Sequence, residues 1–430
     1  MTLRLRADAV LLPDHTILYG GAIDIGDDGR IDAVGTVADL PAPEGGVEFV
    51  GGLLMPGLVN AHAHTPMTLV RSAGDGLPLQ EWLTTAVWPR EGRMTPQDAY
   101  WGMLLGSAEM LLSGVTTSCE MYFFDGQVVQ AVRDSGARVV STPGVVSVML
   151  PDGDPTPRID ELTEFHAANH DPDAGINIGL APHSVYDLGP EHVGEIARRA
   201  REVDALFHIH LEETEAERQL VIDNFGATAT ELLAREGVLE GKVIAAHGVW
   251  LSESDMGLLG ETGAAVAHCP MSNLKLGSGM ADVPSMLNAG ITVGLGTDGA
   301  ASNDALDLWQ ELKIAPLLAR GRAHDPQAMS ASAALELATT SAAKAIGLDD
   351  VGAIAPGMRA DIIRIDLDAP MFAPGDDLLA HVVFAGSGRH VTDVWVSGRQ
   401  VVKARECLTV DVGEAVAECR QRGQQLRDDL

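Results

Sequence analysis

The sequence predicts an α/β fold, a (β/α)8 TIM barrel, with a small β-sandwich built from both ends of the chain. Between residues 56 and 350, eight short apolar runs alternate with longer segments, several of them with helical spacing. This alternation is typical of parallel strands joined by helices. Residues 1–55 and 351–430 instead hold short apolar stretches separated by Pro, Asp and Gly, followed by one final helix. We expect these two ends to form the parts of the sandwich.

The expected elements can be given in chain order. The N-terminal strands are Ala9–Leu12, Ile17–Tyr19, Gly21–Gly26 and Arg30–Gly35. The eight barrel strands are Leu53–Val59, Gly114–Cys119, Arg138–Val145, Ile176–Ala181, Leu206–His210, Lys242–His247, Ala264–His268 and Ile291–Gly296. The expected helices are Thr95–Leu112, Pro190–Val203, Thr214–Arg235, Asp304–Ala319 and Ala331–Ile346. The C-terminal elements are strands Ala360–Ile365, His390–Val396, Gly398–Val402 and Cys407–Val412 and helix Gly413–Arg427.

An open doubly wound sheet is the alternative to the barrel. The glycine pattern Gly-x-Gly-x-x-Gly, which many such sheets carry after the first strand, is absent here, and this disfavours the open sheet. A TIM barrel needs about 250 residues, and the alternating region is long enough for it.

The composition excludes several classes of function. The net charge of −32 repels phosphate backbones and anionic lipids, so we expect no nucleic-acid partner and no membrane partner. The N-terminus lacks the apolar core of a secretory signal, and no run of 18 apolar residues occurs. The four cysteines are widely spaced without a C-x-x-C pair, which indicates a reducing compartment. The expected location is the cytoplasm.

Polar residues that suit metal or acid–base chemistry follow the ends of the predicted barrel strands. In a β/α barrel these C-terminal ends form the catalytic rim. The polar residues are His62 and His64 after the first strand, His183 after the fourth, His210 and Glu213 at the fifth, His247 at the sixth, His268 at the seventh and Asp298 after the eighth.

The pair His62 and His64 is the strongest single sign of a metal site, because residues i and i+2 of a strand point to the same face. Together with His210 and Asp298 these imidazoles make a ligand set without thiolates, which suits zinc and also iron or manganese. Such a cation lowers the pKa of a bound water molecule, so that hydroxide is available near neutral pH. Asp298 is placed to contact the metal and accept a proton, and Glu213 is placed to move a proton to or from a leaving group.

These segments resemble the amidohydrolase superfamily, in its mononuclear branch. Within that branch the chain is similar to the cytosine-deaminase-like group, which holds S-adenosylhomocysteine, methylthioadenosine and adenosine deaminases and triazine hydrolases. The resemblance covers nearly the whole chain. The matching segments are Pro56–His64, His210–Thr214, Ala246–Gly248, Gly296–Asn303 and, at the return to the sandwich, Pro356–Ile362.

The resemblance implies a role for each matching residue. The ligands of one divalent metal ion, usually zinc, would be His62, His64, His210 and Asp298. Glu213 would move protons to the substrate ring and to ammonia, and His247 would orient the attacking water. The implied substrate contacts are His183 with the ring, Trp82 packing on the substrate and Glu91 accepting from ribose hydroxyls. Relatives of this kind often assemble, so a homo-oligomer is expected.

One departure from the family pattern bears on the substrate. S-adenosylhomocysteine deaminases resembling this chain carry Thr-Arg-Gly after strand three, where this chain has Thr142-Pro143-Gly144. Proline supplies no cation for an amino-acid carboxylate, although Arg158 offers a basic group further along. The expected reaction is therefore hydrolytic deamination of adenosine, 5′-deoxyadenosine or 5′-methylthioadenosine.

The sequence is also compatible with other functions. The same metal site would also serve a deaminase or hydrolase of a free nucleobase, a pterin or a triazine. A second alternative is a non-catalytic, metal-stabilised scaffold, although such proteins would be expected to lose metal ligands that this chain keeps. Asn273 and Ser302 are further candidates for the rim, and Leu276–Gly279 is either a mobile lid or a turn.

Overall fold

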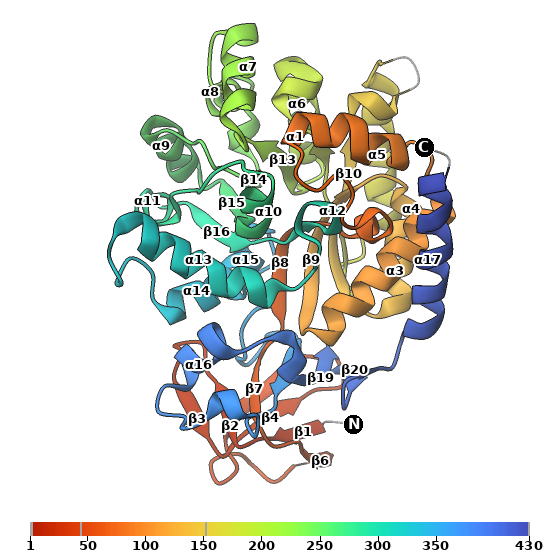
Figure 1. Ribbon diagram of the computed structural model, residues 1–430. Coiled ribbons are helices and arrows are strands. Elements are labelled where there is room, and N and C mark those ends of the chain that lie inside the picture. Colours follow the sequence, from red (N-terminus) through yellow and green to blue (C-terminus); the bar gives the residue numbers. More distant parts are fainter. Residues whose placement is uncertain (1–2, 44, 151–152, 429–430) are drawn as a thin grey trace.

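The computed structural model describes residues 3–43, 45–150 and 153–428. It has two parts, a β/α barrel, which is the upper part in Figure 1, and a smaller β-sandwich, which lies below it. The barrel is continuous in sequence, whereas the sandwich takes strands from both ends of the chain. The predicted fold class is thereby confirmed.

The sandwich consists of two sheets packed face to face. The four-stranded sheet has the order β5-β4-β1-β6 and the seven-stranded sheet the order β21-β20-β19-β18-β7-β2-β3. Apolar side chains from both sheets form a common core, including Leu5, Ile23, Leu54, Ile362 and Trp395. The strands are β1 (Leu3–Arg6), β2 (Ala9–Leu11), β3 (Ile17–Tyr19), β4 (Gly21–Ile25), β5 (Ile31–Thr36), β6 (Gly46–Phe49), β7 (Leu53–Pro56), β18 (Ile362–Ile365), β19 (Val391–Val396), β20 (Arg399–Lys403) and β21 (Glu406–Cys407).

The barrel strands are parallel and buried. They run in the orders β11-β10-β9-β8-β17 and β13-β14-β15-β16, with β12 paired to β10. Their bounds are β8 (Leu58–His64), β9 (Val115–Tyr122), β10 (Arg138–Val145), β11 (Ile176–Ile178), β12 (Ala181–Pro182), β13 (Phe207–Leu211), β14 (Val243–His247), β15 (Ala265–His268), β16 (Thr292–Leu295) and β17 (Asp298–Gly299).

The two groups of barrel strands meet at both of their edges. On one side Leu180 N donates to Leu206 O at 2.9 Å and His208 N donates to Leu180 O at 3.0 Å. On the other side β17, which follows β16, pairs with β8 in the register Asp298 to Ala63. The C-terminal ends of distant strands are therefore brought to one end of the barrel.

The expected first barrel strand, Leu53–Val59, is wrong in its position. Leu53–Pro56 is β7 of the sandwich, paired with β18, and the barrel strand β8 begins at Leu58 and ends at His64. Consequently His62 and His64 lie within a strand rather than after it. β1 and β6, and the short β21 in place of Cys407–Val412, also differ from the prediction.

Helices cover the outside of the barrel. The expected segments Thr214–Arg235 and Ala331–Ile346 are each divided into two helices, α7 with α8 and α14 with α15. The principal helices are α3 (Pro96–Leu112), α4 (Asp125–Ser135), α5 (Thr156–Asn169), α6 (Val185–Glu202), α7 (Glu215–Phe225), α8 (Ala229–Arg235), α9 (Glu253–Thr262), α10 (Pro270–Lys275), α11 (Val283–Asn288), α12 (Ala300–Asn303), α13 (Leu308–Ala323), α14 (Ala331–Leu337), α15 (Thr340–Ala345), α16 (Leu378–Ala385) and α17 (Val412–Asp428).

The terminal helix α17 packs on the barrel and not on the sandwich. It runs beside α3 in Figure 1, where Arg422 Nη1 lies 2.9 Å from Asp98 Oδ1 and Cys419 Sγ lies 3.3 Å from Trp101 O. Within the described ranges, no helix combines the length and apolar character needed to span a bilayer.

Between β8 and α3 the chain forms a long excursion over the end of the barrel that faces away from the sandwich (Figure 1). It contains α1 (Leu79–Glu81), a π-helix (Trp82–Val87) and α2 (Trp88–Glu91). Because π-helices are rare and are frequently found at functional sites, this segment points to the same end of the barrel as the candidate for the functional site.

Candidate active site

Four side chains from three strands meet at the C-terminal end of the barrel. His62 and His64 come from β8, His210 from β13 and Asp298 from β17. The Nε2 atoms of His64 and His210 lie 3.2 Å apart, and Asp298 Oδ1 lies 3.3 Å from His62 Nε2 and 3.2 Å from His64 Nε2. One ligand atom from each of His62, His64 and His210 lies within 4.8 Å of the others, and the same holds for His62, His247 and Asp298. The predicted metal ligands are thus adjacent.

The second ring nitrogen of each of these histidines is held from behind. His64 Nδ1 lies 2.5 Å from Met121 O, and His210 Nδ1 lies 2.9 Å from His183 O. His62 Nδ1 lies 2.9 Å from His208 Nε2. Since a carbonyl oxygen only accepts, His64 and His210 carry a proton on Nδ1 and present Nε2 to the cluster. This is the usual arrangement of histidines that ligate a metal ion.

The residues present fit a single divalent cation. His62 Nε2 is buried and makes no hydrogen bond among the described residues, although it lies 3.3 Å from Asp298 Oδ1. Burial lowers the pKa of His62 to about 3, and burial also holds the pKa of His210 well below its usual value. Both imidazoles are therefore neutral and can each offer a nitrogen lone pair to a cation. Burial acts in the same direction on His64, but Asp298 raises the pKa of His64 to about 9. A cation would take the place of that proton.

Asp298 is fixed by hydroxyl groups on its outer oxygen. Ser272 Oγ, on α10, and Ser302 Oγ, on α12, each donate to Asp298 Oδ2 at 2.6 Å. Burial opposes ionisation of Asp298, but its contacts with His62 and His64 bring the pKa of the carboxyl group well below its usual value. Asp298 Oδ2 is therefore occupied by two donors, and Oδ1 is directed at the cluster.

Glu213 is the second carboxylate at the cluster. Its Oε2 lies 3.8 Å from His247 Nε2, and Ser278 Oγ donates to its Oε1 at 3.3 Å. Its backbone N–H donates to Glu217 Oε2 at 2.8 Å, which fixes the turn from β13 into α7. Burial raises the pKa of Glu213, and this suits a group that must hold and release a proton near neutral pH.

His247 lies between Glu213 and the metal-ligand cluster. Its Nδ1 is 2.9 Å from Asn273 Oδ1, on α10, which leaves Nε2 facing the carboxylates. Although burial lowers it, the pKa of His247 is raised overall by Glu213 and Asp298. His268, by contrast, is buried in β15 and does not line the pocket described next.

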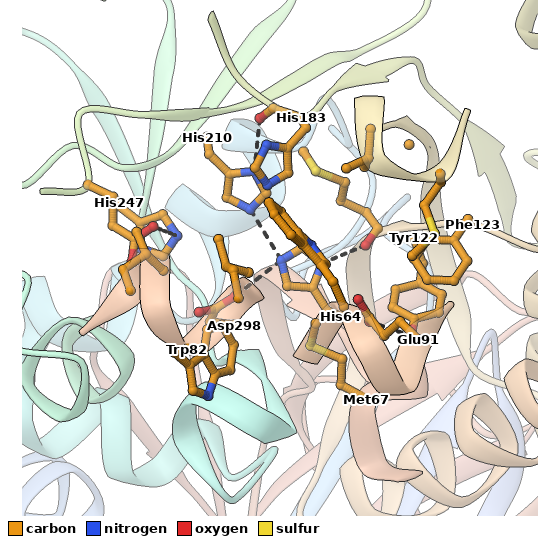
Figure 2. Close-up of a pocket in the computed structure, with 18 of the residues that line it drawn as sticks. His64, Met67, Trp82, Glu91, Tyr122, Phe123, His183, His210, His247 and Asp298 are labelled. Atoms are coloured by element: carbon orange, nitrogen blue, oxygen red, sulfur yellow. Dashed lines mark hydrogen bonds and ion pairs between the residues drawn. The ribbon is translucent and has the colours of Figure 1, made fainter. Parts of the chain in front are cut away.

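A pocket borders the cluster, and Figure 2 shows side chains that line this pocket. Glu91, Tyr122 and Phe123 lie on one side of His64, and His247 lies on the other. The lining residues are His64, Met67, Leu79, Trp82, Leu83, Trp88, Glu91, Met121, Tyr122, Phe123, Gly144, Val146, Met149, His183, Tyr186, His210, Glu213, His247, Leu276 and Asp298.

The predicted substrate contacts Trp82, Glu91 and His183 all line this pocket. Trp82 Nε1 donates to Ala73 O at 2.8 Å, so its indole ring is fixed in the wall. Tyr122 Oη donates to Glu91 Oε1 at 2.7 Å, and burial raises the pKa of Glu91 to about 7. These positions are compatible with the expected roles.

Arg158 is not brought to the pocket, contrary to the expected substrate contact. It lies on α5, with Nη2 2.6 Å from Asp125 Oδ2 and Nη1 3.2 Å from Glu161 Oε2. Its guanidinium group is therefore committed to two carboxylates outside the lining. Among the described residues that line the pocket, none is a lysine or an arginine.

The segment Leu276–Gly279 is a packed turn in this structure. Ser278 is buried, its N–H donates to Asn273 O at 2.8 Å, and its carbonyl accepts from Trp250 Nε1 at 2.7 Å. Its hydroxyl contact with Glu213 could not be foreseen from the sequence, because the two residues are 65 positions apart. Ser302 and Glu217 carry a weak signal, since each lies four residues after the group it supports.

Comparisons with known proteins agree with this geometry. Residues 53–401 match the model of the Amidohydrolase family. The 5-methylthioadenosine/S-adenosylhomocysteine deaminase of Pelotomaculum thermopropionicum is 39% identical over 393 residues, which are 91% of this chain and 90% of that protein. The protein of the same name from Halobacterium salinarum is 39% identical over 426 residues, or 99% of this chain and 98% of that one.

A solved structure also matches over nearly the whole chain. The crystal structure of an adenosine deaminase from Xanthomonas campestris with bound zinc has a TM-score of 0.93 and 32% sequence identity, and the match covers 99% of this chain and 98% of that one. The matched segment 53–401 contains the barrel strands and every residue of the metal-ligand cluster. The chain belongs to the amidohydrolase family.

Proposed function

We propose that this protein is a zinc-dependent hydrolytic deaminase of an adenine nucleoside with an uncharged 5′ group, such as 5′-methylthioadenosine, 5′-deoxyadenosine or adenosine. The observation that carries the proposal is the pocket itself. It joins the cluster of His62, His64, His210 and Asp298 to the proton carrier Glu213 at one end and to Glu91 on a wall whose described residues include no lysine or arginine. The names of the curated relatives and of the zinc-bound structure support the same reaction class.

The reaction replaces the amino group on the purine ring by oxygen from water and releases ammonia. Zinc, held by His62, His64, His210 and Asp298, would supply the acidity that makes water reactive at neutral pH. Asp298 accepts a proton from that water and passes it to the departing amine. Glu213 protonates the ring nitrogen beside the carbon that is attacked and regains a proton from the same water, which in all gives up both of its protons. His247 stabilises the charge that develops on oxygen.

Glu91 is the proposed ribose contact. Its carboxyl group is buried at the pocket wall and receives one hydrogen bond from the part of the chain that the structure describes, from Tyr122 Oη at 2.7 Å to Oε1, which leaves Oε2 available. A pair of neighbouring hydroxyl groups is a fitting partner for a desolvated carboxylate, because each hydroxyl can donate a hydrogen bond. His183, whose Nδ1 lies 3.2 Å from Ser184 Oγ, is the proposed contact with the ring.

The wall beside Glu91 supports an apolar 5′ group. The rings of Tyr122 and Phe123 stack with their centroids 4.2 Å apart, and Val146 and Met149 line the same pocket. A thioether or methyl group would pack well on this surface. An amino-acid tail would bring a carboxylate into a pocket whose described lining holds no lysine or arginine, and leaving a buried charge unpaired costs several kcal/mol.

Ammonia release from a substrate panel tests the proposal. We expect kcat/KM for 5′-methylthioadenosine to exceed that for S-adenosylhomocysteine by a factor of about 100 or more, which corresponds to about 3 kcal/mol for the unpaired carboxylate. The panel also includes adenosine, 5′-deoxyadenosine, adenine, guanine, cytosine, a pterin and a triazine. Equal values for the two thioether nucleosides would contradict the proposed 5′ selectivity.

Replacement of Glu91 by alanine separates a nucleoside deaminase from an enzyme that acts on free bases or triazines. Ribose recognition predicts that Glu91→Ala lowers kcat/KM for nucleosides far more than for free bases. Glu81→Ala is the matched control, because Glu81 is exposed in the same excursion and does not line the pocket. If the variant and the control acted alike on every nucleoside, Glu91 would not be a ribose contact.

Removal of zinc should lower the stability of the folded protein. A ligand that binds only the folded state stabilises it by about 2.7 kcal/mol at a free concentration about 100 times its Kd. We therefore expect the midpoint of thermal unfolding to rise when zinc is added to chelator-treated protein and to respond little to magnesium, which prefers oxygen ligands. An unfolding midpoint that ignores both chelator and zinc would contradict the metal assignment.

The proposal retains the expected cytoplasmic location and homo-oligomeric assembly. The four cysteines, which are all free, support a reducing compartment.

A further inference from the structure

His208 is a buried histidine for which the proposed reaction has no use. It lies on β13 two residues before His210, so both side chains point into the barrel, with His208 one layer deeper. Its Nε2 lies 2.9 Å from His62 Nδ1 and its own Nδ1 lies 2.9 Å from Thr142 Oγ1. Thr142 Oγ1 in turn lies 2.8 Å from the carbonyl oxygen of Glu120. These contacts form one chain across β8, β13, β10 and β9.

The carbonyl group at the end of this chain determines the direction of every hydrogen bond in it. Glu120 O can only accept, so the single hydroxyl proton of Thr142 points at it. Thr142 Oγ1 must then accept from His208 Nδ1–H. Neither ring nitrogen of His208 contacts a carboxylate among the described residues, and the neutral ring carries one proton, so His208 Nε2 accepts from His62 Nδ1–H. The lone pair of His62 is thus placed on Nε2, which faces the cluster.

We propose that His208 and Thr142 are positioning residues that hold His62 in the tautomer required of a metal ligand. The other two histidine ligands support this inference, because their Nδ1 atoms meet backbone carbonyls directly, those of Met121 and His183. The partner of His62 Nδ1 is instead a side chain, that of His208. Thr142 and His208 together provide the acceptor that keeps the proton of His62 on Nδ1. The inference rests on the proposed metal site but is independent of the substrate.

Cys119 explains why the hydroxyl of Thr142 is needed. Its Sγ lies 3.6 Å from His208 Nδ1, where a thiol can donate as well as accept. Without the Thr142 oxygen, donation by the thiol would favour a lone pair on His208 Nδ1 and a proton on His208 Nε2. His62 Nδ1 would then have to accept, and its proton would move to Nε2, the atom that faces the metal site.

The test compares two pairs of variants with the wild-type protein. Thr142→Val removes the acceptor at nearly constant volume, and Thr142→Ser keeps it. His208→Phe removes the acceptor for His62, and His208→Gln keeps an acceptor in its carbonyl oxygen. Zinc affinity is measured on metal-free protein by competition with a chromophoric chelator, and the unfolding midpoint of the metal-free protein is measured alongside.

We expect Thr142→Val and His208→Phe to bind zinc about 10- to 100-fold more weakly than wild type, the usual effect of losing an outer partner of a metal ligand. Thr142→Ser and His208→Gln should stay close to wild type. A purely structural role predicts lower unfolding midpoints with unchanged zinc affinity in Thr142→Val, and that result would overturn the inference. If the wild-type protein bound no zinc, both this inference and the proposed metal site would fail.

Discussion

Replacing Glu213 by glutamine is expected to lower the turnover number by a factor of about 100 to 10,000, the usual contribution of general acid–base catalysis. The amide has the shape of the carboxyl group and keeps an acceptor for Ser278 Oγ, which lies 3.3 Å from Glu213 Oε1. It cannot give a proton to the ring nitrogen. The Glu213 backbone contact with Glu217 does not involve the replaced side chain, so the turn should persist. Zinc affinity should therefore change little.

The pH dependence provides a second readout for Glu213. Burial raises the pKa of its carboxyl group, and a group that donates a proton loses function as the pH rises through its pKa. Wild-type kcat/KM should therefore show a decline at high pH that is absent from the residual activity of Glu213→Gln. Glu215→Gln is the matched control, because Glu215 is exposed in the first turn of α7. Near-full turnover by Glu213→Gln on every substrate would contradict the assigned role.

The fold was predictable because its strands and helices alternate over a long stretch of the chain. The error at the first barrel strand has a specific cause. Leu53–Val59 reads as one apolar run, yet the chain leaves the sandwich at Pro56 and enters the barrel at Leu58. All of β7 and all of β8 except its last residue, His64, are buried, so neither strand shows the alternation that would reveal two sheets. The change of sheet is visible only through the pairing of β7 with β18, about 300 residues later.

The clustering of the proposed metal ligands was predictable for a different reason. They stand at strand ends, where a barrel brings distant segments together, and their chemistry is distinctive. Ser302 could be proposed as a rim residue because it lies four positions after Asp298, but the other groups that orient the ligands were not predictable. Serine and threonine have many structural roles, and the partners of these groups are distant in sequence. Ser272 reaches Asp298 across 26 positions and Thr142 reaches His208 across 66. Arg158 was misplaced because Asp125, its partner 33 positions away, was not recognised.

Asp298 is the residue whose neutralisation should have the largest effect on the site. It has φ 61°, in the left-handed region that asparagine tolerates, so Asp298→Asn should fold where bulkier or branched residues would be strained. Ser272 and Ser302 can turn their hydroxyl groups to meet either an amide oxygen or an amide nitrogen. The variant therefore removes the negative charge while largely preserving the position of the side chain.

The loss of charge at Asp298 should affect zinc binding and turnover together. If the amide nitrogen faces the cluster, it has no lone pair for a cation; if the oxygen faces it, that oxygen is neutral and a poor proton acceptor. We expect weaker zinc affinity and, at saturating zinc, turnover at least about 100-fold below wild type. Asp304→Asn is the matched control, since Asp304 also has a positive φ of 69° but pairs with Lys275 and does not line the pocket.

The comparison of Asp298→Asn with Glu213→Gln distinguishes the two carboxylates. Asp298 Oδ1 lies within 3.3 Å of the Nε2 atoms of His62 and His64, whereas Glu213 Oε2 lies 3.8 Å from Nε2 of His247, which is not a proposed ligand. Only the first variant should therefore weaken zinc binding, while both should abolish most of the turnover. Groups that serve one reaction are not additive, so the double variant should be little worse than the poorer single variant. Multiplicative losses in the double variant would show that the two carboxylates act independently, against the single reaction that the proposed proton transfers complete together.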